Sequence, residues 1–75
     1  MLVYCIFEND ELIWARNYYI ENEKEEIEKI KETYNDIKDK VEVSNIKLEN
    51  NKLEFVNCGV EKHIIFVEEL RKGNK

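Results

Sequence analysis

The 75 residues of this chain carry 39% charged side chains, a net charge of −5 and 43% hydrophobic residues. A hydrophobic share of this size excludes an intrinsically disordered chain, and the length suits one small domain over residues 1–75. Two cysteines are too few for a disulfide scaffold, and no hydrophobic run reaches the length of a membrane span. These properties predict a cytoplasmic protein without membrane attachment.

A polar Asn9-Asp10 pair separates two short hydrophobic segments near the start of the sequence. Asn and Asp adopt positive φ angles more readily than most residues, and the two central positions of a tight β-turn require such angles. The pattern therefore predicts a β-hairpin, whose uninterrupted register places Cys5 opposite Trp14. A turn followed by a short helix from Leu12 is the alternative.

The segment 22–40 has the spacing of an amphipathic helix. Its hydrophobic residues recur every three or four positions, at Ile27, Ile30, Tyr34, Ile37 and Val41. Asn22 is suited to the N-cap and Glu25 to the third helical position, which is close to a capping box. Acidic residues in the first turn and lysines in the last turn also match the helix dipole. We therefore expect a helix that contributes one hydrophobic stripe to the core.

A second β-hairpin is predicted about Asn50-Asn51. This turn places Leu48 opposite Leu53 on one face, and on the other face it forms two pairs of opposite charge, Glu49 with Lys52 and Lys47 with Glu54. A shift of one residue would break both arrangements, so the register is well specified. The hydrophobic residues before Ser44 are out of phase with this alternation, and a β-bulge is expected there.

The rest of the chain predicts one more strand. Asn57-Cys58-Gly59 has the composition of a turn, and residues 60–67 include a run that is hydrophobic on both faces, as in the centre of a sheet. A polar tail follows, with frayed ends expected at 70–75. The complete order is ββαβββ, a small α+β fold in which an antiparallel sheet packs on one amphipathic helix. One helix leaves part of such a sheet exposed, unless a strongly twisted sheet wraps around it.

Cys58 and His63 are the residues closest to a nucleophile and base pair, and Cys5 could add a third soft ligand. A zinc site usually needs four ligands at close spacing, and nucleophilic catalysis needs an orienting group and an oxyanion hole. The sequence around these residues offers neither arrangement. Buried cysteines that behave as small hydrophobic side chains are the favoured interpretation, so no catalytic residue, metal or cofactor is predicted.

Negative charge is concentrated in the first part of the chain. Residues 1–28 have eight acidic and two basic side chains, a net charge of −6, whereas residues 29–75 have nine acidic and ten basic ones, a net charge of +1. A solvated surface that serves the helix dipole is one interpretation, and a surface that attracts a basic partner is the other. The predicted partner-binding residues are Glu8, Asp10, Glu11, Trp14, Tyr18, Tyr19, Glu23 and Glu26.

Together these features predict a small acidic protein-interaction module without enzymatic activity, which binds a basic surface of another protein as an inhibitor or regulator. Phage antagonists of nucleic-acid-handling host systems often have this size and charge, an analogy of class and not of residues. Direct nucleic-acid binding is disfavoured because the net charge has the wrong sign. Two alternatives are a structural homodimer and a small-ligand binder or enzyme that uses Cys58 and His63.

Overall fold

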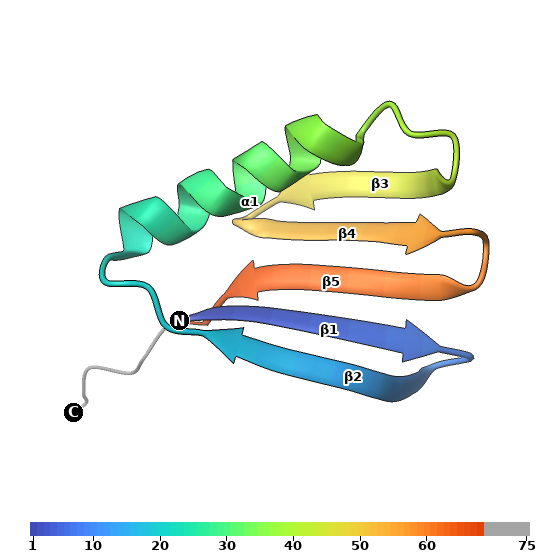
Figure 1. Ribbon diagram of the computed structural model, residues 1–75, viewed down its shortest axis with the longest axis horizontal. Coiled ribbons are helices and arrows are strands. Elements are labelled where there is room, and N and C mark those ends of the chain that lie inside the picture. The colour runs from blue at the N-terminus through green and yellow to red at the C-terminus, as the bar shows by residue number, and fades with distance from the viewer. Residues whose placement is uncertain (69–75) are drawn as a thin grey trace.

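The computed structural model describes residues 1–68 and consists of a five-stranded antiparallel sheet with one helix (Figure 1). The elements in chain order are β1 (Leu2–Glu8), β2 (Glu11–Tyr18), α1 (Glu23–Ile37), β3 (Val43–Glu49), β4 (Lys52–Asn57) and β5 (Glu61–Val67). This order confirms the predicted ββαβββ arrangement and the α+β class. The expectation for the tail at 70–75 falls outside the described residues.

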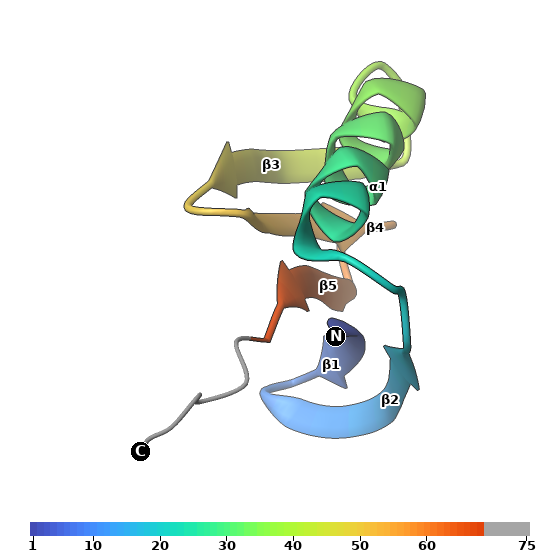
Figure 2. The same ribbon diagram turned by 90° about the vertical axis from the view of Figure 1, so that its left-hand side faces the viewer.

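The strands lie in the order β2-β1-β5-β4-β3, so β5 is central and β2 and β3 form the two edges. Helix α1 covers one face over β4 and β5, where Ile30 and Leu53 are completely buried. Figure 2 shows β1 and β2 curving toward the side on which α1 lies, so the sheet wraps partly around the core. The twisted sheet therefore buries some of the hydrophobic area, while much of β2 stays exposed.

Helix α1 begins as the sequence predicts and ends earlier. The side chain of Asn22 accepts a hydrogen bond of 2.8 Å from the backbone N–H of Glu25, which confirms the N-cap. The helix stops at Ile37, and Lys38 is its C-cap. Val41 consequently lies beyond the helix with 98% of its surface exposed, so its predicted place in the hydrophobic stripe is wrong.

The Asn22 cap gives a first stability prediction. Asn22→Ala is expected to lower the free energy of unfolding by about 1 kcal/mol, because the Glu25 N–H loses its acceptor at a helix end. Urea denaturation followed by circular dichroism measures the change. Asn35→Ala, at an exposed position of the same helix, serves as the control and is expected to cause no loss. Equal effects of the two substitutions would contradict a capping role.

The first hairpin has the predicted turn but a different register. Glu8 lies opposite Glu11 and the turn is at Asn9-Asp10, as expected, yet a β-bulge follows in β2. Ile6 therefore faces Trp14, and the predicted pairing of Trp14 with Cys5 is wrong. A bulge adds one residue to one strand, and β2 is an edge strand, where bulges are common.

The second hairpin follows the prediction closely. Leu48 lies opposite Leu53 and the expected bulge lies between Ser44 and Lys47. Glu54 is opposite Lys47 in the ladder, but its ion pair, at 2.9 Å, is with Lys62 on β5. The hydrogen bond from Lys62 lowers the pKa of the Glu54 carboxyl. The two charges thus link β4 to the central strand and not to the edge.

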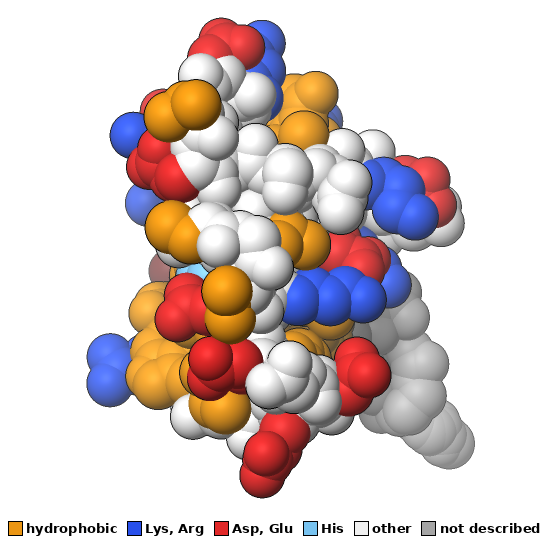
Figure 3. Space-filling model, turned by 90° about the vertical axis from the view of Figure 1, so that its right-hand side faces the viewer, with side chains coloured by type: hydrophobic (Ala, Val, Ile, Leu, Met, Phe, Trp, Pro, Cys, Tyr) orange, Lys and Arg blue, Asp and Glu red, His pale blue; other side chains and the backbone are white. Residues whose placement is uncertain are grey.

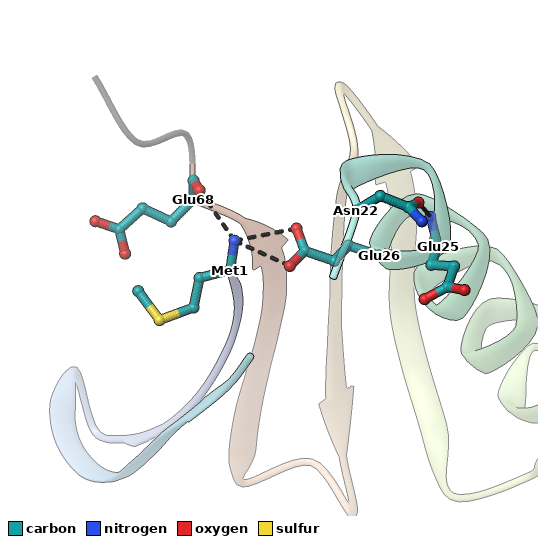
Figure 4. Close-up of polar contacts among 5 residues, drawn as sticks. All are labelled: Met1, Asn22, Glu25, Glu26 and Glu68. Carbon is teal, nitrogen blue, oxygen red and sulfur yellow. Dashed lines mark hydrogen bonds and ion pairs between the residues drawn. The ribbon is translucent and has the colours of Figure 1, made fainter. Parts of the chain in front are cut away.

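Glu26 is buried in an ion pair with the N-terminal amine (Figure 4). The Met1 nitrogen lies 3.1 Å from Oε1 and 3.0 Å from Oε2 of Glu26, whose side chain is only 2% exposed. The same amine donates to the carbonyl of Glu68 at 3.4 Å. Glu26 was expected on an exposed surface for a partner, but the structure buries it, and its carboxylate joins the first turn of α1 to the start of β1.

Candidate partner-binding surface

The turn between β1 and β2 brings several carboxylates together. Asn9 and Asp10 have φ angles of 54° and 66°, which Asn and Asp tolerate better than most residues. The ladder then places Glu8 between Glu11 on β2 and Glu61 on β5. Residues directly opposite one another project from the same face of a sheet, so these three glutamates form a row across three strands.

Within this row, Glu8 and Glu11 form no ion pair with any of residues 1–68, whereas Glu61 lies 3.2 Å from His63 Nε2. The ion pairs of this part of the chain involve Glu26, Glu54 and Glu61, and none of them reaches Glu8, Asp10 or Glu11. Like charges directly opposite each other destabilise a sheet. The arrangement therefore costs folding free energy, which a basic group from another molecule would recover.

Exposed hydrophobic side chains follow these acids along β2. Trp14 shares the face of Glu8 and Glu11 because it pairs with Ile6, whereas Leu12 pairs with Phe7 and projects from the opposite face of this edge. All eight residues of this strand are exposed, including Leu12 at 53%, Ile13 at 48% and Trp14 at 37%. Figure 3 views the end of the molecule with this turn, where hydrophobic and acidic side chains gather over the lower half, with basic side chains beside them. We name this region the hairpin surface, made of Glu8, Asp10, Glu11, Leu12, Ile13, Trp14 and Glu61.

The structure divides the predicted binding residues between two places. Glu8, Asp10, Glu11 and Trp14 belong to the hairpin surface. Tyr18, Tyr19 and Glu23 lie at the far end of β2 and the start of α1, at the opposite end of the molecule in Figure 1. Tyr18 and Tyr19 are exposed as expected. A single surface with all of the predicted residues is therefore not formed.

Three members of the hairpin surface were missing from the sequence-based set. Leu12 and Ile13 were expected in a strand, but only the edge position of β2 exposes them. Glu61 joins the surface through the pairing of β1 with β5, between residues more than fifty positions apart. The sequence offers no local signal for that contact.

A polar chain of Tyr4, His63 and Glu61 adjoins this surface. The Tyr4 hydroxyl lies 2.8 Å from His63 Nδ1, and His63 Nε2 lies 3.2 Å from Glu61 Oε1. A carboxylate only accepts hydrogen bonds, so Nε2–H donates to Glu61. In the neutral imidazole, Nδ1 then accepts from the Tyr4 hydroxyl. Phe55 stacks on the imidazole at 4.7 Å, and Trp14 meets the Tyr4 ring edge-on at 5.3 Å.

The hydrogen bonds among Tyr4, His63 and Glu61 leave no free nitrogen on the imidazole. His63 is 9% exposed and both of its ring nitrogens are engaged. A buried histidine with hydrogen bonds at both nitrogens packs as a core residue and supports its neighbours. Through Tyr4 and Trp14 it connects the central strand to the exposed edge.

The Tyr4 hydroxyl gives a second prediction, on pH. Burial, with smaller contributions from Tyr18 and Glu61, raises the pKa of Tyr4 above its ordinary value of 10.0. The folded state therefore favours the neutral phenol, and its stability falls as the pH rises above about 10. In Tyr4→Phe we expect a shallower fall above about pH 10, and a loss of about 1 kcal/mol at pH 7 from the missing hydrogen bond.

Urea denaturation at several pH values measures both effects of Tyr4→Phe. Tyr19→Phe is the control, because this side chain is 85% exposed. A fall in stability above pH 10 that is as steep in Tyr4→Phe as in the unmodified protein would contradict the prediction.

The cysteines take no part in this arrangement. Cys58 lies in the turn after β4 with a φ of 55°, and Cys5 lies on β1; both are free thiols. Cys58 is exposed and Cys5 half-buried, so the prediction that Cys58 is buried is wrong. Within residues 1–68, no hydrogen bond joins His63 to either cysteine and no cluster of three or more acidic, His or Cys side chains has the geometry of a metal site.

No described helix has the length and hydrophobicity needed to cross a membrane. Comparisons with protein-family models, curated proteins and solved structures give no match to this chain. Its function must therefore be argued from the geometry of the hairpin surface.

Proposed function

We propose that this protein is a small non-enzymatic interaction module that binds a basic surface of another protein through the hairpin surface. Its role would be that of an inhibitor or regulator. The observation that carries the proposal is the row of Glu11, Glu8 and Glu61, in which Glu8 and Glu11 form no ion pair within residues 1–68 and lie close to exposed hydrophobic side chains.

The carboxylates and the hydrophobic side chains of the hairpin surface would contribute to binding in different ways. Unpaired carboxylates raise the association rate with a positively charged partner and favour the correct orientation. Exposed Trp14, on the same face as Glu8 and Glu11, can then be buried in contact, and large aromatic side chains contribute much of the binding energy in protein interfaces. A basic face shaped for nucleic-acid phosphates is one such partner surface, which agrees with an antagonist of a nucleic-acid-handling protein.

Charge reversal at the turn tests this proposal. The triple variant Glu8→Lys, Asp10→Lys, Glu11→Lys is compared with Glu23→Lys, Glu25→Lys, Glu28→Lys at the start of α1. Both variants change the net charge by the same amount, and all of the residues are exposed except Glu8, which is half-buried. The immobilised proteins are incubated with lysate of the native host, and the retained proteins are identified by mass spectrometry.

We expect the unmodified protein and the helix variant to retain the same basic protein, and the turn variant to lose it by at least tenfold. Circular dichroism verifies that each variant is folded. Trp14→Ala, which leaves the charge unchanged, is expected to weaken the same interaction. The proposal is wrong if the turn variant retains the partner, or if both charge variants lose it equally, since the latter would indicate only a general charge effect.

A further inference from the structure

The outer edge of β2 has no partner among the described strands. It is the first strand in the order β2-β1-β5-β4-β3 and, with eight residues, the longest of the five. An unpaired edge offers a row of backbone N–H and C=O groups to another strand. Proteins often block such edges with proline or lysine, and β2 contains neither.

The bulge in β2 sets which side chains share a face. Glu11 and Arg16 are five residues apart, so a regular strand would direct them to opposite faces. The extra residue changes this, because Glu11 pairs with Glu8 and Arg16 with Tyr4, two residues of β1 that share a face. Glu11 and Arg16 therefore project from the same side of the sheet.

Neither of these two charges has an opposite charge beside it in the ladder. Glu11 faces another glutamate and Arg16 faces a tyrosine. The other edge differs, because Lys47 and Glu49 of β3 lie opposite acidic and basic residues of β4. Although Glu54 forms its ion pair with Lys62, charges of both signs that lack an oppositely charged residue opposite them in the ladder thus occur on the β2 edge and not on the β3 edge.

From these features we propose that two copies of this chain associate through antiparallel pairing of their β2 strands, with Glu11 of each copy opposite Arg16 of the other. The same register places Leu12 opposite Ala15 and Ile13 opposite Trp14. Leu12 and Ala15 share a face, because they pair with Phe7 and Cys5 of β1. One register therefore matches both charges and contacts between exposed hydrophobic residues, and it joins the two sheets into one of ten strands.

A charge exchange tests this pairing without any other protein. Sedimentation velocity is measured over a range of concentrations in about 150 mM salt, where long-range charge effects are screened. The unmodified protein is expected to approach twice the 9.1 kDa of one chain. Arg16→Glu and Glu11→Arg should each remain at the mass of one chain, because like charges then meet at both ends of the pairing.

An equal mixture of the two variants should recover the doubled mass. In the mixture, the Arg16→Glu copy carries glutamate at both positions and the Glu11→Arg copy carries arginine at both. Every glutamate of one copy is then opposite an arginine of the other. Glu11→Arg also separates pairing from general repulsion, since it reduces the net charge from −5 to −3 and would favour association if repulsion alone governed it. Lys47→Glu on the opposite edge is the control and should behave like the unmodified protein.

Three results would overturn the proposal: an unmodified protein that stays at 9.1 kDa at every concentration, single variants that associate as it does, or a mixture that does not recover. Circular dichroism monitors folding, and Arg16→Gln with Glu11→Gln replaces any variant that fails to fold, with weakened association expected for each. These measurements use the purified chain alone, so their failure would leave the proposal for a basic partner standing. If the pairing does form, it competes with that partner for Glu11 and Trp14.

Discussion

Replacing Ile30 by alanine is expected to lower the free energy of unfolding by about 2 to 5 kcal/mol. Ile30 is completely buried at the centre of α1 and belongs to the same cluster as Leu53, Phe55 and Ile65. The substitution removes buried methyl and methylene groups and leaves a cavity that the surrounding strands fill only in part. A domain of this size has a total stability of roughly 4 to 11 kcal/mol, so much of it would be lost.

Urea denaturation of Ile30→Ala at unchanged m-value measures this loss. Val41→Ala is a matched control, because the sequence pattern assigns both residues to one helical stripe while the structure exposes Val41 almost fully. The control should change stability by less than about 0.5 kcal/mol. Ile30→Val, which removes one methylene, should cost about 0.5 to 1.5 kcal/mol. Similar losses in Ile30→Ala and Val41→Ala would contradict the packing of α1 on the sheet.

Features of the fold that depend on local chemistry could be predicted from the sequence. The Asn22 cap and the turns at Asn9-Asp10 and Asn50-Asn51 each follow from residues within a few positions of one another. Hydrophobic spacing does not determine where a helix ends. The spacing continues to Val41, but the helix stops at Ile37 and Val41 is exposed. A periodic pattern indicates which face a helix would bury and does not determine its last residue.

The order of strands in the sheet could not be predicted from local patterns. β1 pairs with β5, the last strand of the sequence, and this long-range pairing decides which strand remains at the edge. Several strands are hydrophobic enough to occupy the centre, so many orders satisfy the same alternation. The bulge in β2 is equally hidden, since Leu12-Ile13-Trp14 is hydrophobic in either register.

The candidate site was therefore predictable only in part. Acidic residues at the β1–β2 turn and the exposed Trp14 followed from composition and spacing. The contribution of Glu61 and the separation of Glu23 from the turn depend on how strands and helix are arranged in space. The net charge of the sequence indicates that the protein has a negative surface. Where that surface lies can be determined only from the arrangement of the strands and the helix.

Glu26 was expected to bind a partner, whereas in the structure its buried carboxylate stabilises the fold. Its sequence neighbours are acidic residues at a helix start, which typically face solvent. Its partner is the Met1 amine, 25 positions away. A buried carboxylate is tolerated when a cation and hydrogen bonds compensate for its lost hydration, and the two contacts near 3 Å supply both.

Removing either partner should therefore destabilise the protein, by different amounts. Glu26→Gln is expected to cost about 1 to 3 kcal/mol, because the amine is partly exposed and can be hydrated while glutamine still accepts one hydrogen bond. Acetylation of the Met1 amine is expected to cost more, about 3 to 5 kcal/mol, because it leaves a buried carboxylate without a cation. Urea denaturation measures both, with Glu28→Gln at an exposed position of α1 as the control.

Combining the two changes tests whether the groups act as a pair. If they do, acetylation of the Glu26→Gln variant should cost at least about 1 kcal/mol less than acetylation of the unmodified protein, since no buried carboxylate remains to be stranded. Strictly additive effects would show that the two groups act independently, and a Glu26→Gln loss no larger than that of Glu28→Gln would show that the carboxylate is hydrated. The pair would then not fix α1 to β1, and the burial of Glu26 would need another cause.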